Sequence, residues 1–147
     1  MSEQDVFDAL KYRIEVDAQG TRWYYNSAGQ LHRDEGPAVE HSDGTKLWYQ
    51  NGLRHRTDGA ADIWADGTKF WHQNGLRHRT DGPAVIWADG TKFWYQNGLR
   101  HRTDGPAIVY TDGYTEWHQH GQLHRIDGPA IEYASGPKAW YINGVEM

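Results

Sequence analysis

The chain has 147 residues, a net charge of -5 and no cysteine, so disulfides, thiolate metal sites and cysteine nucleophiles are excluded. The acidic balance disfavours a nucleic-acid or anionic membrane partner. With a mean hydropathy of -0.91, no apolar run approaches the roughly 18 residues of a membrane span. The N-terminus lacks a signal-peptide pattern, so we expect a soluble, cytoplasmic protein whose 14% aromatic residues supply the burial that disordered chains lack.

The N-terminal segment carries the signals of a short helix and a strand. Ser2 and Asp5 have the spacing of a helix-capping pair, and apolar residues follow them. Residues 12–16 alternate as a strand does. We expect residues 1–19 to form an N-terminal cap.

The rest of the chain is one short unit repeated every 23 residues. Each unit is a near copy of GTKFWYQNGLRHRTDGPAVIWAD. The units span residues 20–43, 44–66, 67–89, 90–112, 113–135 and the partial 136–147. Because a catalytic cluster is normally single and asymmetric, this repetition argues against an enzyme.

Each unit is expected to hold a hairpin and a third short strand. The segment Thr-Lys-Phe-Trp-Tyr-Gln is rich in β-formers and is followed by Asn-Gly, the strongest short hairpin signal. Leu-Arg-His-Arg returns, Thr-Asp-Gly-Pro-Ala breaks the strand, and Val-Ile-Trp precedes a further turn. These patterns predict an all-β, elongated array of stacked hairpins with the Asn-Gly turns along one edge.

Pairing across the turn assigns the side chains to two faces. Trp48 opposes His55, and Tyr49 opposes Arg54. The Trp position is never interrupted by a polar residue, so we predict that this column is the core. The column comprises Tyr24, Trp48, Trp71, Trp94, Trp117 and Trp140.

Two polar columns favour structural roles. The histidines are His32, His55, His78, His101 and His124. A ladder spaces identical groups by one repeat, whereas metal ligands converge on one point, so packing is favoured and no metal site or cofactor is predicted. The arginines Arg33, Arg56, Arg79, Arg102 and Arg125 are each followed by an acid. An internal Arg-carboxylate ladder is favoured over an anion-binding strip.

The candidate binding residues lie on the opposite face, where arginines without an acid in their motif stand beside aromatic rings. Such a surface suits cation-π contacts, planar rings or acidic groups of a partner. The candidates are Tyr49, Phe70, Phe93, Tyr95, Arg54, Arg77 and Arg100. Glu116, His118 and His120 break the repeat and form the alternative binding site, or else mark a capping unit. Asp62 occupies a position that is apolar in the other units.

Residues 20–147 resemble MORN repeats, which stack as successive β-hairpins into an elongated, twisted sheet. The resemblance rests on the period, on Asn-Gly-Leu-Arg-His and on Trp-Ala-Asp-Gly-Thr-Lys. The added motif His-Arg-x-Asp-Gly-Pro-Ala, at 78–84, 101–107 and 124–130, is similar to repeats in proteins of tailed phages and large DNA viruses. The resemblance implies non-enzymatic scaffolding or partner binding.

Two function classes stay open. One is a protein-interaction module, such as a phage or viral protein that inhibits a host defence protein in the host cytoplasm, because Trp, Tyr and Arg are enriched in interface hot spots. The other is a binder or sponge of a small anionic or aromatic ligand. An enzyme ranks third, since no nucleophile with a paired base and no phosphate loop is present.

Overall fold

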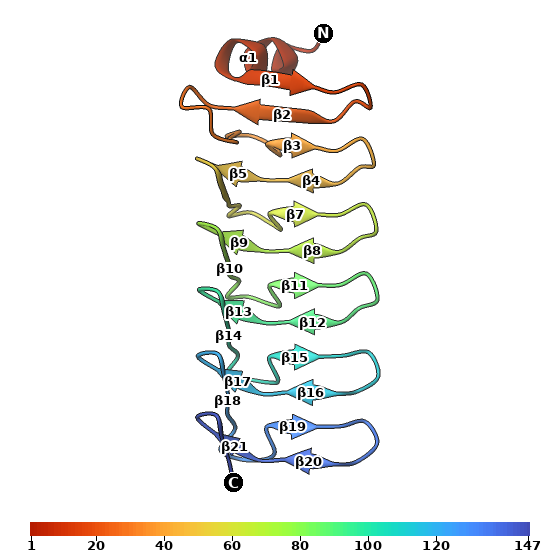
Figure 1. Ribbon diagram of the computed structural model, residues 1–147, viewed down its shortest axis with the longest axis vertical. Helices are drawn as coiled ribbons and strands as arrows, with labels where there is room; N and C mark the ends of the chain where they lie inside the picture. The colour runs from red at the N-terminus through yellow and green to blue at the C-terminus, as the bar shows by residue number, and fades with distance from the viewer.

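The computed structural model describes all residues from Met1 to Met147 and shows an elongated column of stacked hairpins (Figure 1). One short helix lies at the N-terminal end, and the C-terminus lies at the other end. The expected all-β array with a short helix and strand before it is confirmed. No helix is both long and apolar enough to cross a membrane.

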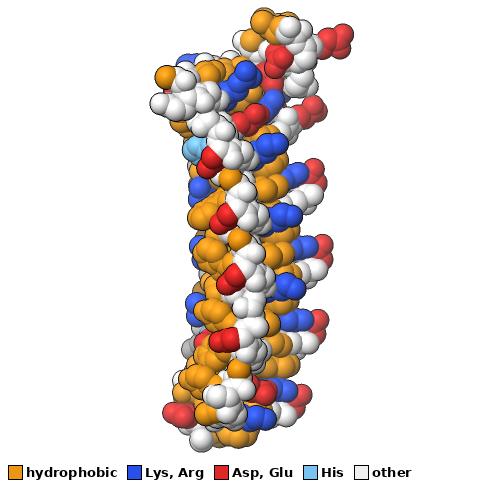
Figure 2. All heavy atoms as spheres, turned by 90° about the vertical axis from the view of Figure 1, so that its right-hand side faces the viewer, with side chains coloured by type: hydrophobic (Ala, Val, Ile, Leu, Met, Phe, Trp, Pro, Cys, Tyr) orange, Lys and Arg blue, Asp and Glu red, His pale blue; other side chains and the backbone are white.

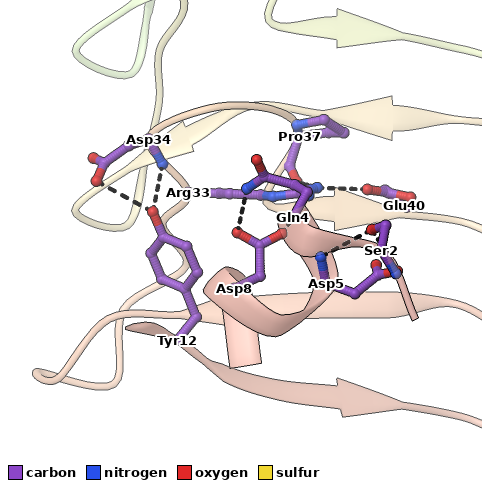
Figure 3. Close-up of polar contacts among 9 residues, drawn as sticks. All are labelled: Ser2, Gln4, Asp5, Asp8, Tyr12, Arg33, Asp34, Pro37 and Glu40. Atoms are coloured by element: carbon purple, nitrogen blue, oxygen red, sulfur yellow. Dashed lines mark hydrogen bonds and ion pairs between the residues drawn. The ribbon is translucent and has the colours of Figure 1, made fainter. Parts of the chain in front are cut away.

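The cap forms as its sequence predicts. Helix α1 (Glu3–Lys11) begins with a capping box, in which the Ser2 hydroxyl accepts from the Asp5 amide and the Asp5 carboxylate accepts from the Ser2 amide. Strand β1 (Arg13–Val16) pairs with β2 (Arg22–Tyr25). The buried Asp8 carboxylate lies 2.7 Å from Arg33 Nη2, which ties the helix to the first unit (Figure 3).

One antiparallel sheet of twelve strands runs the length of the column. After β1 and β2 its strands are, in order, β3 (Val39–Glu40), β4 (Lys46–Leu47), β7 (Asp62–Ile63), β8 (Lys69–Phe70), β11 (Val85–Ile86), β12 (Lys92–Phe93), β15 (Ile108–Val109), β16 (Thr115–Glu116), β19 (Ile131–Glu132) and β20 (Lys138–Ala139). Each full unit contributes two strands, so at about 4.8 Å per strand the column grows by about 9.6 Å per unit.

Small two-stranded hairpins line one edge of the column (Figure 1). They pair β5 (Tyr49–Gln50) with β6 (Leu53–Arg54), β9 (His72–Gln73) with β10 (Leu76–Arg77), β13 (Tyr95–Gln96) with β14 (Leu99–Arg100), β17 (His118–Gln119) with β18 (Gln122–Leu123), and β21 (Tyr141–Ile142) with β22 (Val145–Glu146). Asn51 and Gly52 have φ values of 50° and 81°, as a turn with two left-handed residues requires. The predicted hairpins, their register and the alignment of their turns are confirmed.

The expectation of three strands per unit is wrong, because the first predicted strand breaks in two at its tryptophan. The Trp48 amide donates to the Ala61 carbonyl at 2.7 Å, and the Trp48 carbonyl accepts from His55 at 3.1 Å. These bonds lie outside the strand ladders, so residues before Trp48 belong to the large sheet and residues after it to the small hairpin.

The prediction that the Trp column is the core is wrong for all of its tryptophans. Trp71 is half-buried and Trp140 is 48% exposed, whereas the fully buried positions include Ala84 and Val85. The core lies on the side of the Ala and Val positions, joined there by Phe70. The tryptophans are covered instead by the arginine ladder described below.

Neighbouring units are joined by hydrogen bonds as well as by strand pairing. His55 Nδ1 accepts from the amide of Asn74 in the next unit at 3.0 Å, and the Gly75 amide donates to the Arg54 carbonyl at 2.9 Å. Five histidines repeat the first contact, each accepting from an amide 19 residues further on. The histidine column therefore has a structural role, in which each Nδ1 accepts a hydrogen bond from the following unit.

Candidate functional site

The face that carries the tryptophans is occupied by internal contacts. Arg79 Nε lies 2.8 Å from Asp81 Oδ1, its Nη1 donates to the Pro83 carbonyl at 3.1 Å, and its guanidinium carbon lies 4.0 Å from the centre of the Trp71 ring. The same three contacts recur at Arg56, Arg102 and Arg125. The predicted Arg-carboxylate ladder is confirmed for these four arginines, whose guanidinium groups are already engaged. For Arg33 it is wrong, because Arg33 pairs with Asp8 and Glu40 and not with Glu35.

Three polar grooves lie between successive Thr-Asp-Gly loops on this face. Their volumes are about 560, 480 and 380 Å³. Each groove is walled by ladder arginines and by aspartates such as Asp81, whose side chain is 83% exposed. Because the cations are paired with these exposed carboxylates, the grooves offer little to an anion.

The opposite face carries a continuous row of aromatic rings. We call Trp64, Phe70, Trp87, Phe93 and Tyr110 the aromatic strip. Successive ring centres are 5.3, 5.4, 6.4 and 5.7 Å apart, and Trp64 and Tyr110 are each 41% exposed. Figure 2, which looks onto the edge of the column made by the Asp-Gly turns, shows hydrophobic side chains flanking that edge over most units.

The strip has one open slot. It lies between Trp87 and Tyr110, has a volume of about 320 Å³, and is also lined by Phe93, Asp89 and Thr91. The slot opens here because Phe93 stands further from its neighbours than the buried Phe70 does from its own.

Arginines of the small hairpins border the strip. The Arg77 guanidinium lies 5.5 Å from the ring centres of both Phe70 and Tyr95, and Arg77 makes no ion pair within 4.0 Å. Arg100 likewise has no ion pair within that distance. Arg54 differs, because its Nε lies 3.1 Å from Asp62 Oδ1. The expectation that Arg54 lacks an acid is therefore wrong: the acid stands eight residues later and reaches Arg54 only through the fold.

The predicted ring residues are less accessible than a binding face requires. Phe70 and Tyr95 are buried, and Tyr49 and Phe93 are half-buried. Phe70 and Tyr95 are not exposed as the predicted binding face requires, because their rings pack with Val85 in the core. The rings that sequence reasoning missed are the aromatics just before the turns that join the units, Trp64, Trp87, Tyr110 and Tyr133, of which all but the half-buried Trp87 are exposed.

Asp62 and His72 form a buried polar cluster beneath this face. His72 Nδ1 lies 3.9 Å from Asp62 Oδ1, and neither atom has a hydrogen-bond partner. Burial raises the pKa of Asp62 to about 6 against the opposing charges of Arg54 and Arg77. Burial, together with the same two charges, lowers the pKa of His72 to about 4. At neutral pH the pair is a carboxylate beside a neutral imidazole.

A second polar cluster surrounds Glu116. The Tyr114 hydroxyl donates to Glu116 Oε1 at 2.5 Å, and His118 Nε2 lies 2.7 Å from Glu116 Oε2. The hydrogen bond from His118 is the main cause that lowers the pKa of Glu116. His120 lies apart in the hairpin turn, with its amide on His101 Nδ1. The alternative site is thus brought together for Glu116 and His118 but not for His120.

Comparison with known proteins leaves the site as the main guide to function. No family model matches the chain, and no curated protein is significantly similar to it. The resemblance to MORN repeats therefore stays a prediction. No group of three or more His, Cys, Asp or Glu side chains is arranged to hold a metal ion.

Proposed function

We propose that the protein is a non-enzymatic protein-interaction module that binds its partner along the aromatic strip. The observation that carries this proposal is the row of partly exposed rings bordered by Arg77 and Arg100, two cations without ion pairs. Aromatic and arginine side chains dominate the binding energy of protein interfaces. The tryptophan face offers no comparable surface, because its cations are engaged in the ladder.

The two polar clusters support a structural rather than a catalytic reading. His72 and His118 are both buried, and the Glu116 carboxylate already accepts from Tyr114. A general acid or base needs access to a substrate atom, which these positions do not give. The proposal includes a phage or viral protein that uses the aromatic strip to bind and block a host protein.

The slot between Trp87 and Tyr110 favours a second candidate, a binder of one small planar ring. Its volume of about 320 Å³ is at the lower limit of ligand pockets. It is also shallow and single, whereas the strip extends over several units.

A photo-crosslinking amino acid placed at Tyr110 or Trp64 tests the main proposal. In cells that contain the partner, we expect discrete protein adducts from these positions, which fade when Arg77→Gln is added. The same amino acid at Lys92 or Thr80, both exposed on the other face, is the matched control. Equal adducts from both faces, or none, would contradict the proposal. Absence of adducts together with a small molecule in native mass spectra that Trp87→Ala displaces would favour the second candidate.

A further inference from the structure

Three rings of the strip, exposed at Trp64 and Tyr110 and half-buried at Trp87, recur at a fixed step. Trp64, Trp87 and Tyr110 occupy the same position of three successive units, so they follow one another at about 9.6 Å, the height of one unit. The column is straight over these units in Figures 1 and 2, so these three rings form a straight row of ridges.

The spacing of about 9.6 Å matches the repeat of one backbone conformation of a bound peptide better than it matches the others. A polyproline II helix repeats every three residues and rises about 9.3 Å in that distance, a mismatch of about 0.3 Å per unit. An α-helix advances about 10.5 Å in seven residues, which misses by about 0.9 Å per unit. In a β-strand every third residue points to the opposite face, so it cannot place equivalent side chains between successive ridges.

The chemistry of the strip agrees with its spacing. Aromatic-lined grooves are the recurring means by which proline-rich segments are recognised, since the rings pack on the proline and the segment has little entropy to lose. The slot between Trp87 and Tyr110 is such a groove. On one border stand Arg77 and Arg100 without ion pairs, and on the other stands Asp89 at its turn. A bound segment would therefore place its acidic side chains toward the arginines.

Resting on the proposed function, we infer that the partner presents a polyproline II segment along the strip. Its prolines pack between the rings of Trp64, Trp87 and Tyr110, with every third residue equivalent, and its acidic residues face Arg77 and Arg100. A segment of about six residues spans the two steps between the three ridges from Trp64 to Tyr110.

Two synthetic peptides of identical composition test the inference on the full chain. One is (Pro-Pro-Glu)₅, and the other gathers the five glutamates in one block at its end. Calorimetric titration is expected to show at least tenfold tighter binding of the triplet peptide. Its affinity should fall at least tenfold in Trp87→Ala and at least threefold in Arg77→Gln. It should not change in Lys69→Gln, a neutralised cation whose side chain projects from the opposite face of β8. Thermal melting checks that each variant is folded, and Arg77→Gln, an exposed position, keeps the test valid if Trp87→Ala is unstable.

Equal binding of the two peptides, or no binding, would overturn the inference. If protein adducts still form from Tyr110, the strip remains the interaction surface and only the conformation assigned to the partner is wrong. If neither peptide binds and no adduct forms, the proposed function falls as well. Binding of an alternating Glu-Phe peptide in place of the triplet peptide, with the same dependence on Arg77, also overturns the polyproline assignment.

Discussion

The guanidinium of Arg79 lies over the indole of Trp71, with its carbon 4.0 Å from the ring centre, and is held there by Asp81 and the Pro83 carbonyl. This contact replaces hydrocarbon burial as the cover of the tryptophan. It recurs in four units.

Arg79→Lys is expected to lower the free energy of unfolding by about 1–2 kcal/mol, because lysine keeps the charge but not the fork of donors or the planar stack. Arg77→Lys, two residues away on the other face, is the matched control and should change it by less than about 0.5 kcal/mol. Chemical denaturation measures both. Equal losses would mean that the ladder contributes no more than an exposed cation.

Gly105 lies against the same kind of stack in the next unit. A Cβ at this position would come 2.6 Å from Arg102 Cζ, so Gly105→Ala must push the guanidinium off Trp94. We expect a loss of about 1–2 kcal/mol. In an Arg102→Ala background the loss should vanish, since no guanidinium is left to displace. A double-mutant cycle gives this coupling, and additive effects would show that Gly105 does not act through Arg102.

Asp62 lowers the stability of the fold. Its carboxylate takes the place of a buried Val or Ile, and its Oδ1 has no hydrogen bond. Asp62→Val should therefore raise the free energy of unfolding by about 1–3 kcal/mol, while Arg54, 38% exposed, returns to solvent. Val85→Asp is the reverse exchange one unit further on and should destabilise the protein. A less stable Asp62→Val protein would show that the ion pair with Arg54 outweighs the burial of the carboxylate.

The advantage of Asp62→Val should depend on pH. The pKa of Asp62 in the folded protein is raised to about 6, so the protonated carboxyl is better tolerated in the fold than the carboxylate. This stabilisation is fully present below the unfolded value near 3.8 and is lost as the pH rises through 6. The difference in stability between Asp62→Val and the natural chain should therefore grow, by on the order of 2 kcal/mol, from pH 4 to above pH 6. His72, whose pKa is lowered to about 4 mainly by burial, adds a slope of the opposite sign in both proteins. Denaturation curves at several pH values check this, and a constant difference would contradict it.

Local signals predicted most of the fold correctly. The Asn-Gly turns, the register of Tyr49 against Arg54, the Ser2 capping box and the Arg-Asp ladder all depend on residues close in sequence. Alternation alone also showed that each unit has two different faces.

Which face is the core could not be predicted in the same way. Both faces carry aromatic residues, and the outcome depends on the break at Trp48, which places the small hairpin outside the large sheet. Proximity in sequence also misled at His120, because its turn carries it away from Glu116. The ion pair of Arg54 and Asp62 could not be predicted either, because it joins the small hairpin to the large sheet.

Because each histidine accepts from the turn of the following unit in the same way, neighbouring units are joined by the same hydrogen bond throughout. Duplicating or deleting one block of 23 residues would preserve these hydrogen bonds on either side of it. The length of the column would therefore change in steps of about 9.6 Å per block. Natural variation in the number of blocks would lengthen or shorten the aromatic strip without any redesign of the core.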